Sequence, residues 1–189
     1  ELLFGNRDYQ KDGAEIALRF LNSGEYKDIT ALAKENFEKN EVIRARWNND
    51  FSKMQDDLES SDKLSATLDL ATGTGKSYVM FAIALIMLAT KKVSRVLVLV
   101  PSTTIERELT QKFKDLLENQ QLLKTLGQNF VPPQILNGDS TIVENSIAIE
   151  NRDAIYKAQS SRNSIIDSLR GNGEKTLVLN DEVHHVYYS

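Results

Sequence analysis

The sequence contains no cysteine, no long apolar run and no excess of positive charge. Without cysteine, the 189-residue chain forms neither a disulfide nor a cysteine-ligated metal site. This composition fits the reducing cytosol, so we expect a cytoplasmic protein. The longest apolar run, 78–89, is too short to span a bilayer and lacks the N-terminal position and cleavage site of a signal peptide. A net charge of −4 gives no overall basic signature of nucleic-acid binding.

The remaining composition is that of an ordinary globular domain. Hydrophobic residues make up 41% of the chain and charged residues 26%, and the length fits one compact domain at 1–189. The chain begins at Glu1 rather than at a methionine. We therefore expect it to be part of a larger protein, or a protein with a trimmed terminus.

Strands and helices alternate along most of the chain. Apolar periodicity predicts strands at 64–70, 95–100, 134–136, 146–149 and 176–179. Helical spacing predicts helices at 9–22, from 29 onwards, and at 41–60, 76–89, 105–123 and 163–170. This alternation favours an α/β fold with a doubly wound, mainly parallel sheet.

A glycine-rich turn joins the strand predicted at 64–70 to the apolar helix predicted at 76–89. Its sequence is Ala71-Thr72-Gly73-Thr74-Gly75-Lys76-Ser77. The two glycines let the backbone approach phosphates closely, and the N–H groups at a helix N-terminus attract anions. Lys76 would reach the β- and γ-phosphates of a nucleotide, and the Ser77 hydroxyl would bind Mg²⁺. The order of strand, turn and helix favours a phosphate-binding loop over a chance turn.

Two carboxylates directly follow the strand predicted at 176–179. They belong to Asp181 and Glu182, and doubly wound sheets bind ligands at the carboxyl ends of their strands. Asp181 would hold Mg²⁺, directly or through water, and Glu182 would orient the water that attacks the γ-phosphate. A solvated turn is the weaker interpretation, because apolar strand residues precede the pair.

The only histidines of the chain, His184 and His185, come next. His184 completes the box Asp181-Glu182-Val183-His184, and we predict a coupling role for it. Zinc binding by Glu182, His184 and His185 is an alternative, but it lacks the i, i+4 spacing of the known helical zinc motif. The sequence gives no separate function for His185.

The phosphate-binding loop and the Asp-Glu-x-His box together resemble motifs I and II of superfamily-two helicases and translocases. They are similar to DEAD/DEAH-box proteins of the restriction-endonuclease type, including the motor subunits of type III and type I restriction systems. The resemblance implies a P-loop, RecA-like domain that uses ATP and Mg²⁺ and acts on nucleic acid, double-stranded DNA first of all. It covers nearly the whole chain except 27–63, which looks like a helical insertion. That stretch is either a partner or DNA surface, or a solvated helical hairpin.

Three further segments are similar to motifs of this group. Arg7-Asp8-Tyr9-Gln10 resembles its adenine-recognition segment, with Gln10 reading the base edge. This implies nucleotide contacts from Arg7 and Gln10 as well as from the loop residues Thr72, Gly73, Thr74 and Gly75. Ser102, Thr103 and Thr104 resemble motif Ia, whose hydroxyls contact the phosphates of a nucleic-acid strand. Ser146–Asn151 lies where the family places another strand-contact loop.

The resemblance also implies parts that this chain lacks. Seven residues follow Glu182, which leaves no room for motif III or for the second RecA-like domain with its arginine finger. We therefore expect the chain to be the first lobe of a motor that binds nucleotide weakly and hydrolyses it poorly alone. The implied partners are nucleic acid, that second domain and a specificity or methyltransferase subunit, with no membrane.

Two other functions share the phosphate-binding loop. A P-loop kinase would phosphorylate a small molecule without needing nucleic acid, and the Asp-Glu-x-His box speaks against it. A regulatory domain would bind nucleotide without using it, and the presence of Lys76, Ser77, Asp181 and Glu182 argues against such a loss of activity.

Overall fold

The computed structural model describes residues 3–5, 7–58, 64–68, 70–71, 73–137, 140–152, 169 and 171–181. The chain divides into two compact units, one made of Glu1–Lys11 and Thr72–Ser189 and the other of Asp12–Ala71. The boundary falls within helix α1 (Asp8–Asn22). Among the described residues, no helix has the length and apolar character needed to cross a membrane.

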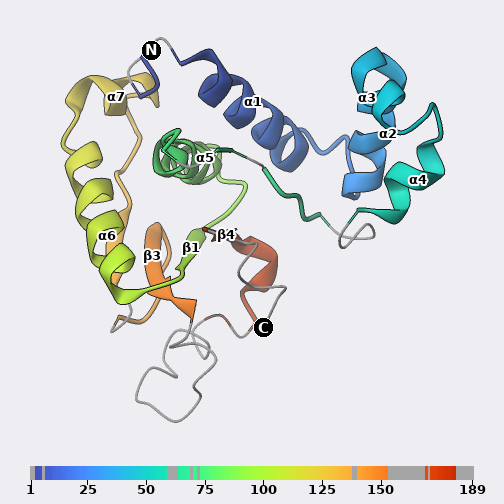
Figure 1. Ribbon diagram of the computed structural model, residues 1–189. Coiled ribbons are helices and arrows are strands. Elements are labelled where there is room, and N and C mark those ends of the chain that lie inside the picture. The colour runs from blue at the N-terminus through green and yellow to red at the C-terminus, as the bar shows by residue number, and fades with distance from the viewer. Residues whose placement is uncertain are drawn as a thin grey trace. The chain divides into compact units, whose positions relative to one another are not determined.

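The first unit is built on a parallel sheet with flanking helices (Figure 1). In the described part of the chain, the sheet has four strands in the order β2-β3-β1-β4. Their bounds are β1 (Arg95–Val100), β2 (Gln134–Asn137), β3 (Ser146–Asn151) and β4 (Thr176–Asn180). All three pairings are parallel. The structure therefore confirms the predicted α/β class.

The centre of the sheet is apolar on both faces. Val96 and Val98 of β1 are fully buried, and every residue of β3 is buried as well. An unbroken run of Val and Leu suits such a strand, because helices or loops cover both of its faces. Burial of the whole apolar run explains why β1 has the bounds predicted from the sequence, 95–100.

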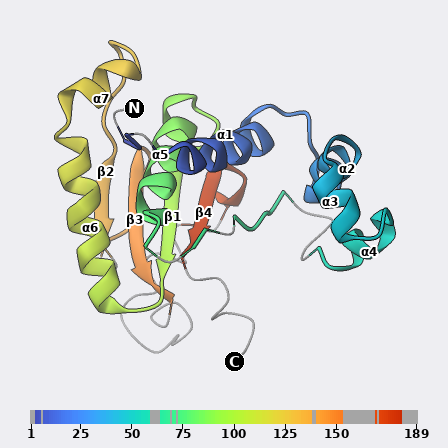
Figure 2. The same cartoon turned by 45° about the horizontal axis from the view of Figure 1, so that its top comes forward.

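Two helices of the first unit pack side by side (Figure 2). They are α5 (Lys76–Ala89) and α6 (Thr103–Leu117), and α6 is followed by α7 (Gln120–Thr125). The rings of Phe81 and Phe113 meet edge to face with their centroids 5.0 Å apart, and both side chains are fully buried. This contact fixes α6 against the first half of α5.

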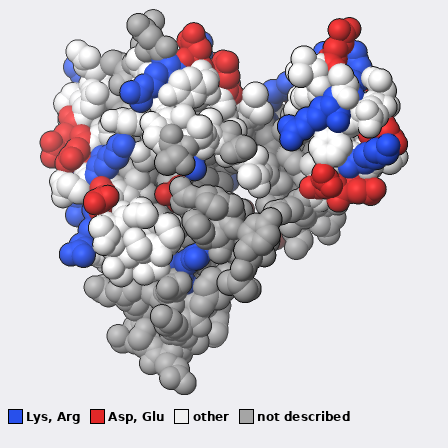
Figure 3. Space-filling view, in the orientation of Figure 1, with Lys and Arg blue, Asp and Glu red and all other residues white. Residues whose placement is uncertain are grey.

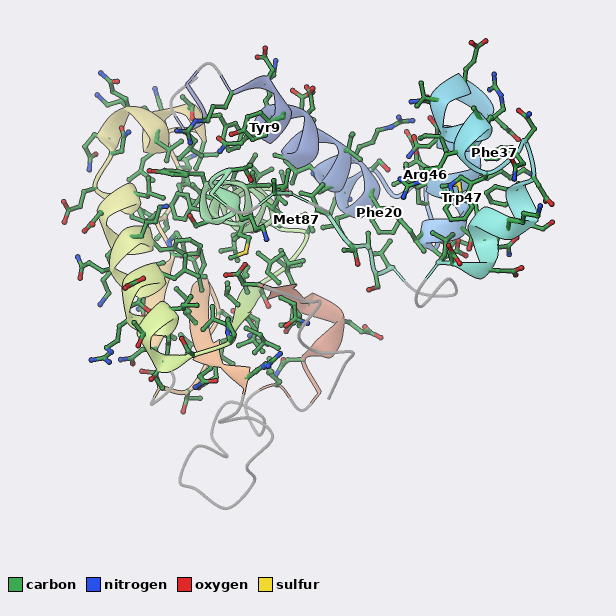
Figure 4. All side chains as sticks on the ribbon, in the orientation of Figure 1. Tyr9, Phe20, Phe37, Arg46, Trp47 and Met87 are labelled. Carbon is green, nitrogen blue, oxygen red and sulfur yellow. The ribbon has the colours of Figure 1, made fainter. Side chains whose placement is uncertain are left out.

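The second unit is helical. Besides most of α1 it contains α2 (Ile29–Lys39), α3 (Glu41–Arg46) and α4 (Phe51–Asp56). Phe20, Tyr26 and Leu32 form one apolar cluster, and the rings of Phe37 and Phe51 meet with their centroids 5.5 Å apart. Figure 4 labels Phe20 on α1 and Phe37 on α2. The helical segment expected at 27–63 thus consists of three short helices in the described residues.

A charged network joins the end of α1 to α2. The Glu35 carboxylate accepts hydrogen bonds from Lys39 at 2.7 Å, from the Tyr26 hydroxyl at 2.5 Å and from Arg19 at 2.8 Å. These three donors, Lys39 first, lower the pKa of Glu35 to about 2. The network keeps Glu35 ionised at any ordinary pH.

The strand predicted at 64–70 is wrong for the residues that the structure describes there, since 64–68 and 70–71 have no strand pairing. Leu64 and Leu68 remain partly exposed. A Cβ placed on Gly13 of α1 would lie 3.4 Å from Leu68, so this leucine packs against a helix and not within a sheet. Alternating leucines form a strand only where a neighbour completes the hydrogen-bond ladder.

Two predicted helices are each broken in two. The helix at 41–60 is interrupted where Asn48 and Asn49 take positive φ values of 53° and 58°, and Asp50 then caps α4. The helix at 105–123 stops before Asn119, whose side chain accepts from the first N–H groups of α7. Asn and Asp side chains replace helical hydrogen bonds in this way. The helix predicted at 163–170 lies outside the described residues, apart from 169.

Candidate nucleotide-binding site

The carboxyl ends of three parallel strands meet at one edge of the sheet. Leu99 of β1 is level with Glu150 of β3 and with Asn180 of β4. The next residue, Asp181, donates its backbone N–H to the Leu99 carbonyl at 2.8 Å. The structure therefore places the Asp181 carboxylate at the sheet edge where the sequence predicts ligand binding.

The glycine-rich turn leads directly into α5. Gly73 and Gly75 have φ values of 77° and 81°, in the left-handed region that favours glycine. Gly75 is the N-cap of α5 and offers no side chain as an acceptor. The positive end of a 14-residue helix thus begins at Lys76 without a side-chain cap, which is an arrangement that favours an anion.

The segment before α1 lies against this turn. The Tyr9 hydroxyl donates to the Thr74 carbonyl at 3.2 Å, and the Gln10 amide donates to the same oxygen. A Cβ on Gly75 would lie 2.5 Å from Gln10 Nε2 and 3.3 Å from an Arg7 guanidinium nitrogen. The structure thus brings Arg7 and Gln10 together with the glycine-rich turn, and their nucleotide contacts stay predictions.

Gln10 is fully buried, and of its two polar side-chain atoms only the nitrogen has a hydrogen-bond partner among the described residues. Its Nε2 bonds to Thr74, whereas its Oε1 has no hydrogen-bond partner among the described residues. Buried polar atoms are nearly always paired, so an unpaired one points to a missing ligand or water. Gln10 keeps an acceptor available beside the loop.

Ser77 has a partner that sequence reasoning missed. Lys112 of α6 donates from Nζ to Ser77 Oγ at 2.6 Å, and its ammonium lies 4.0 Å from the centre of the Tyr78 ring. No motif marks Lys112 in the sequence. The contact depends on the packing of α6 against α5, which apolar periodicity does not specify.

Ser102, Thr103 and Thr104 lie at the N-terminus of α6, which begins two residues before the predicted start at 105. The Ser102 hydroxyl caps the helix by accepting from the Ile105 N–H at 3.3 Å, and its own proton remains to be donated. Thr103 and Thr104 are exposed in the first turn. All three hydroxyls therefore belong to one helix end.

The interpretation of Ser146–Asn151 as a strand-contact loop is wrong. These residues form β3, and all six are buried. At its carboxyl end, the Asn151 N–H donates to the buried Glu106 carboxylate at 3.2 Å, which ties this strand to α6. A buried strand offers nucleic acid no surface.

The family described as "Type III restriction enzyme, res subunit" matches residues 6–189. The chain belongs to this family. Membership in the res-subunit family confirms the resemblance seen in the two sequence boxes, and it implies an ATP-dependent, helicase-like motor domain that interacts with nucleic acid. No curated protein and no solved structure matches the chain.

The ATP and divalent cation that res-subunit domains use fit the residues present here. Gln10 offers a buried acceptor, Gly75 forms a cradle that a Cβ would fill, and Lys76 supplies positive charge. Ser77 and Asp181 offer the oxygen ligands that Mg²⁺ prefers. Among the described residues, His, Cys, Asp and Glu form no group of three that could hold a metal. Two oxygen ligands suffice for Mg²⁺, which keeps waters and takes phosphate oxygens.

Three predicted site residues, Thr72, Glu182 and His184, lie outside the described residues, as does His185. Their roles in the res-subunit domain stay predictions.

Proposed function

We propose that the chain is the ATP-binding lobe of an ATP-dependent DNA translocase or helicase, the motor of a restriction-type enzyme. The observation that carries this proposal is the Gln10 amide, which is buried against the phosphate-binding loop with one acceptor unpaired. A phosphate-binding loop alone accepts any nucleotide. A buried amide beside it adds selection for the base.

The Gln10 amide suits adenine because its acceptor and donor match the donor and acceptor on the edge of the base. Adenine presents an amino donor and a ring-nitrogen acceptor side by side, and Asn or Gln pairs with both. Gln10 Oε1 would accept from the adenine amino group. The second N–H of the Nε2 atom, which already bonds to Thr74, would donate to the ring nitrogen.

The phosphates would lie at the N-terminus of α5. Lys76 and the backbone N–H groups of the turn would bind them, and Ser77 and Asp181 would hold the divalent cation. When bound, Mg²⁺ neutralises charge on the β- and γ-phosphates. Glu182 would then orient the attacking water and accept its proton, and His184 would couple this site to the rest of the motor.

Nucleic acid would contact the N-terminus of α6. Hydroxyl donors and a helix dipole bind phosphates irrespective of base sequence, which is what a motor that moves along a strand requires. On the face drawn in Figure 3, the Lys and Arg of the described residues are interspersed with Asp and Glu.

The partners follow from the same proposal. They are double-stranded DNA, a second RecA-like domain that supplies an arginine finger, and a specificity or methyltransferase subunit, all in the cytoplasm. The helices α2, α3 and α4 would be an insertion at 27–63 into the motor domain. A small-molecule kinase or a non-catalytic nucleotide-binding domain has no observation in its favour.

The Gln10 contact gives a direct test. Gln10→Ala should reduce the preference of the chain for ATP over GTP by about tenfold, the worth of one buried hydrogen bond. Fluorescently labelled ATP and GTP titrated against the chain would measure it. Gln121→Ala, on the exposed side of α7, is the matched control and should change neither affinity. An unchanged ATP preference in Gln10→Ala would contradict base reading by this residue.

A further inference from the structure

Lys112 lies where a divalent cation would bind Ser77. Its Nζ is 2.6 Å from Ser77 Oγ, whereas Mg²⁺ bound to the same oxygen would lie about 2.1 Å away. Both cations would then stand within a few ångströms of each other, and their charges would repel. Occupation of Ser77 by Lys112 and by Mg²⁺ is therefore mutually exclusive.

Packing of α6 against α5 brings Lys112 to Ser77. The next residue, Phe113, is fully buried against Phe81 of α5. The Lys112 ammonium also lies over the ring of Tyr78, one residue after Ser77, at 4.0 Å from its centre. A cation held over an aromatic face is stabilised there. The half-buried lysine is thus held next to Ser77 by the ring of Tyr78 and by the packing of the two helices.

Within the part of the chain that the structure describes, the charge of Lys112 has no partner of opposite sign. Among the described residues it contacts the Ser77 hydroxyl and the Tyr78 ring and forms no ion pair. It stands beside the first turn of α5, where the helix dipole is positive, and contacts Ser77, the residue that follows Lys76. Positive charges gathered in this way are stabilised when an anion enters.

We propose that Lys112 is a built-in counter-cation of the phosphate site. While no divalent cation is bound, it holds the Ser77 hydroxyl and neutralises the phosphates of a metal-free nucleotide. When Mg²⁺ enters, Lys112 gives up this hydroxyl and moves off Ser77. Lys112 is a positioning residue that sets how much Mg²⁺ the site requires, and this role rests on the proposed nucleotide binding.

The proposal predicts two opposite effects of removing the charge. Lys112→Met keeps an unbranched stem for Tyr78 but removes the ammonium. Affinity for ATP in the presence of a chelator should fall by about tenfold, the worth of one charged hydrogen bond. The Mg²⁺ concentration that half-saturates the ATP-bound site should also fall by about tenfold, because the competing cation is gone. A merely structural role would weaken both kinds of binding.

The experiment is an equilibrium titration of the full chain with ATP, first in a chelator and then across a series of Mg²⁺ concentrations. Lys114→Met, an exposed lysine on the same helix, is the matched control and should behave as the unaltered chain. In a Ser77→Ala background, Lys112→Met should no longer change the Mg²⁺ requirement. If Lys112→Met does not fold, Lys112→Gln keeps a donor for Ser77 without the charge and should show the same loss of metal-free affinity.

The outcomes separate this inference from the proposed function. If Lys76→Ala binds ATP as well as the unaltered chain does, the phosphate site itself is wrong. If Lys76→Ala loses ATP but Lys112→Met leaves the Mg²⁺ requirement unchanged or raises it, only the counter-cation role is overturned. Opposite shifts in metal-free and Mg²⁺-dependent binding support it.

Discussion

Replacing Gly75 with alanine tests how closely the base-recognition segment lies against the phosphate-binding loop. The substitution has two separate effects. First, alanine at a φ of 81° is in the left-handed region, which costs an L-residue about 1–2 kcal/mol. Second, the new Cβ would lie 2.5 Å from Gln10 Nε2, closer than any real contact. Gln10 must then move and lose its bond to Thr74, at a cost of about 1 kcal/mol.

Gly73 provides a matched control for the first effect. Its φ is 77°, nearly that of Gly75, but a Cβ there would have no atom within 4 Å. Gly73→Ala should therefore lower the free energy of unfolding by about 1–2 kcal/mol. Gly75→Ala should lower it by about 1 kcal/mol more.

Urea unfolding of both variants measures this difference. A double variant tests whether the difference comes from the contact with Gln10. When Gln10 is also replaced by alanine, the close contact is relieved, and the extra loss in Gly75→Ala should disappear. Equal destabilisation by Gly73→Ala and Gly75→Ala would refute the close approach of Gln10 to the loop.

Two further predictions concern one contact in each unit. Phe113→Ala removes the ring that fixes α6 against Phe81 and should lower the free energy of unfolding by about 3–5 kcal/mol in a urea titration; a loss below about 1 kcal/mol would contradict this packing. In the helical unit, the pKa of Glu35 is lowered to about 2 from 4.5, so its contribution to stability is complete above pH 4.5 and is lost as the pH falls through 2. Thermal unfolding followed by circular dichroism between pH 6 and pH 2 should show this loss for the unaltered chain and a weaker pH dependence for Glu35→Gln.

The sequence predicts best those elements whose residue pattern is compatible with only one kind of local structure. An apolar helix without breaks and a run of Val and Leu give α5 and β1 their observed bounds, since most residues of both elements are buried. The loop at 71–77 and the position of Asp181 follow from glycine stereochemistry and from the geometry of parallel sheets. The loop depends on its own residues, and the position of Asp181 follows once the sheet is known to be parallel.

The sequence fails where tertiary contacts decide. The leucines at 64–70 have the period of a strand, but Leu68 packs against α1 at Gly13. The helix at 41–60 is broken at two asparagines with positive φ, after which Asp50 caps α4, and the helix at 105–123 is broken where Asn119 caps α7. Lys112 is one of many helical lysines until the packing of Phe81 and Phe113 brings it to Ser77. Each of these outcomes depends on a neighbour that is distant in sequence or on a choice between competing hydrogen bonds.

ATP hydrolysis by Lys76→Ala tests the motor assignment most directly. The measurement is phosphate release by the full-length protein, with and without double-stranded DNA, for the unaltered chain and for this variant. Phosphate release by the unaltered full-length protein should be stimulated by DNA, and Lys76→Ala should release no phosphate above background under either condition. DNA-stimulated hydrolysis that persists in Lys76→Ala would contradict the assignment of this loop as the ATP site of a nucleic-acid motor.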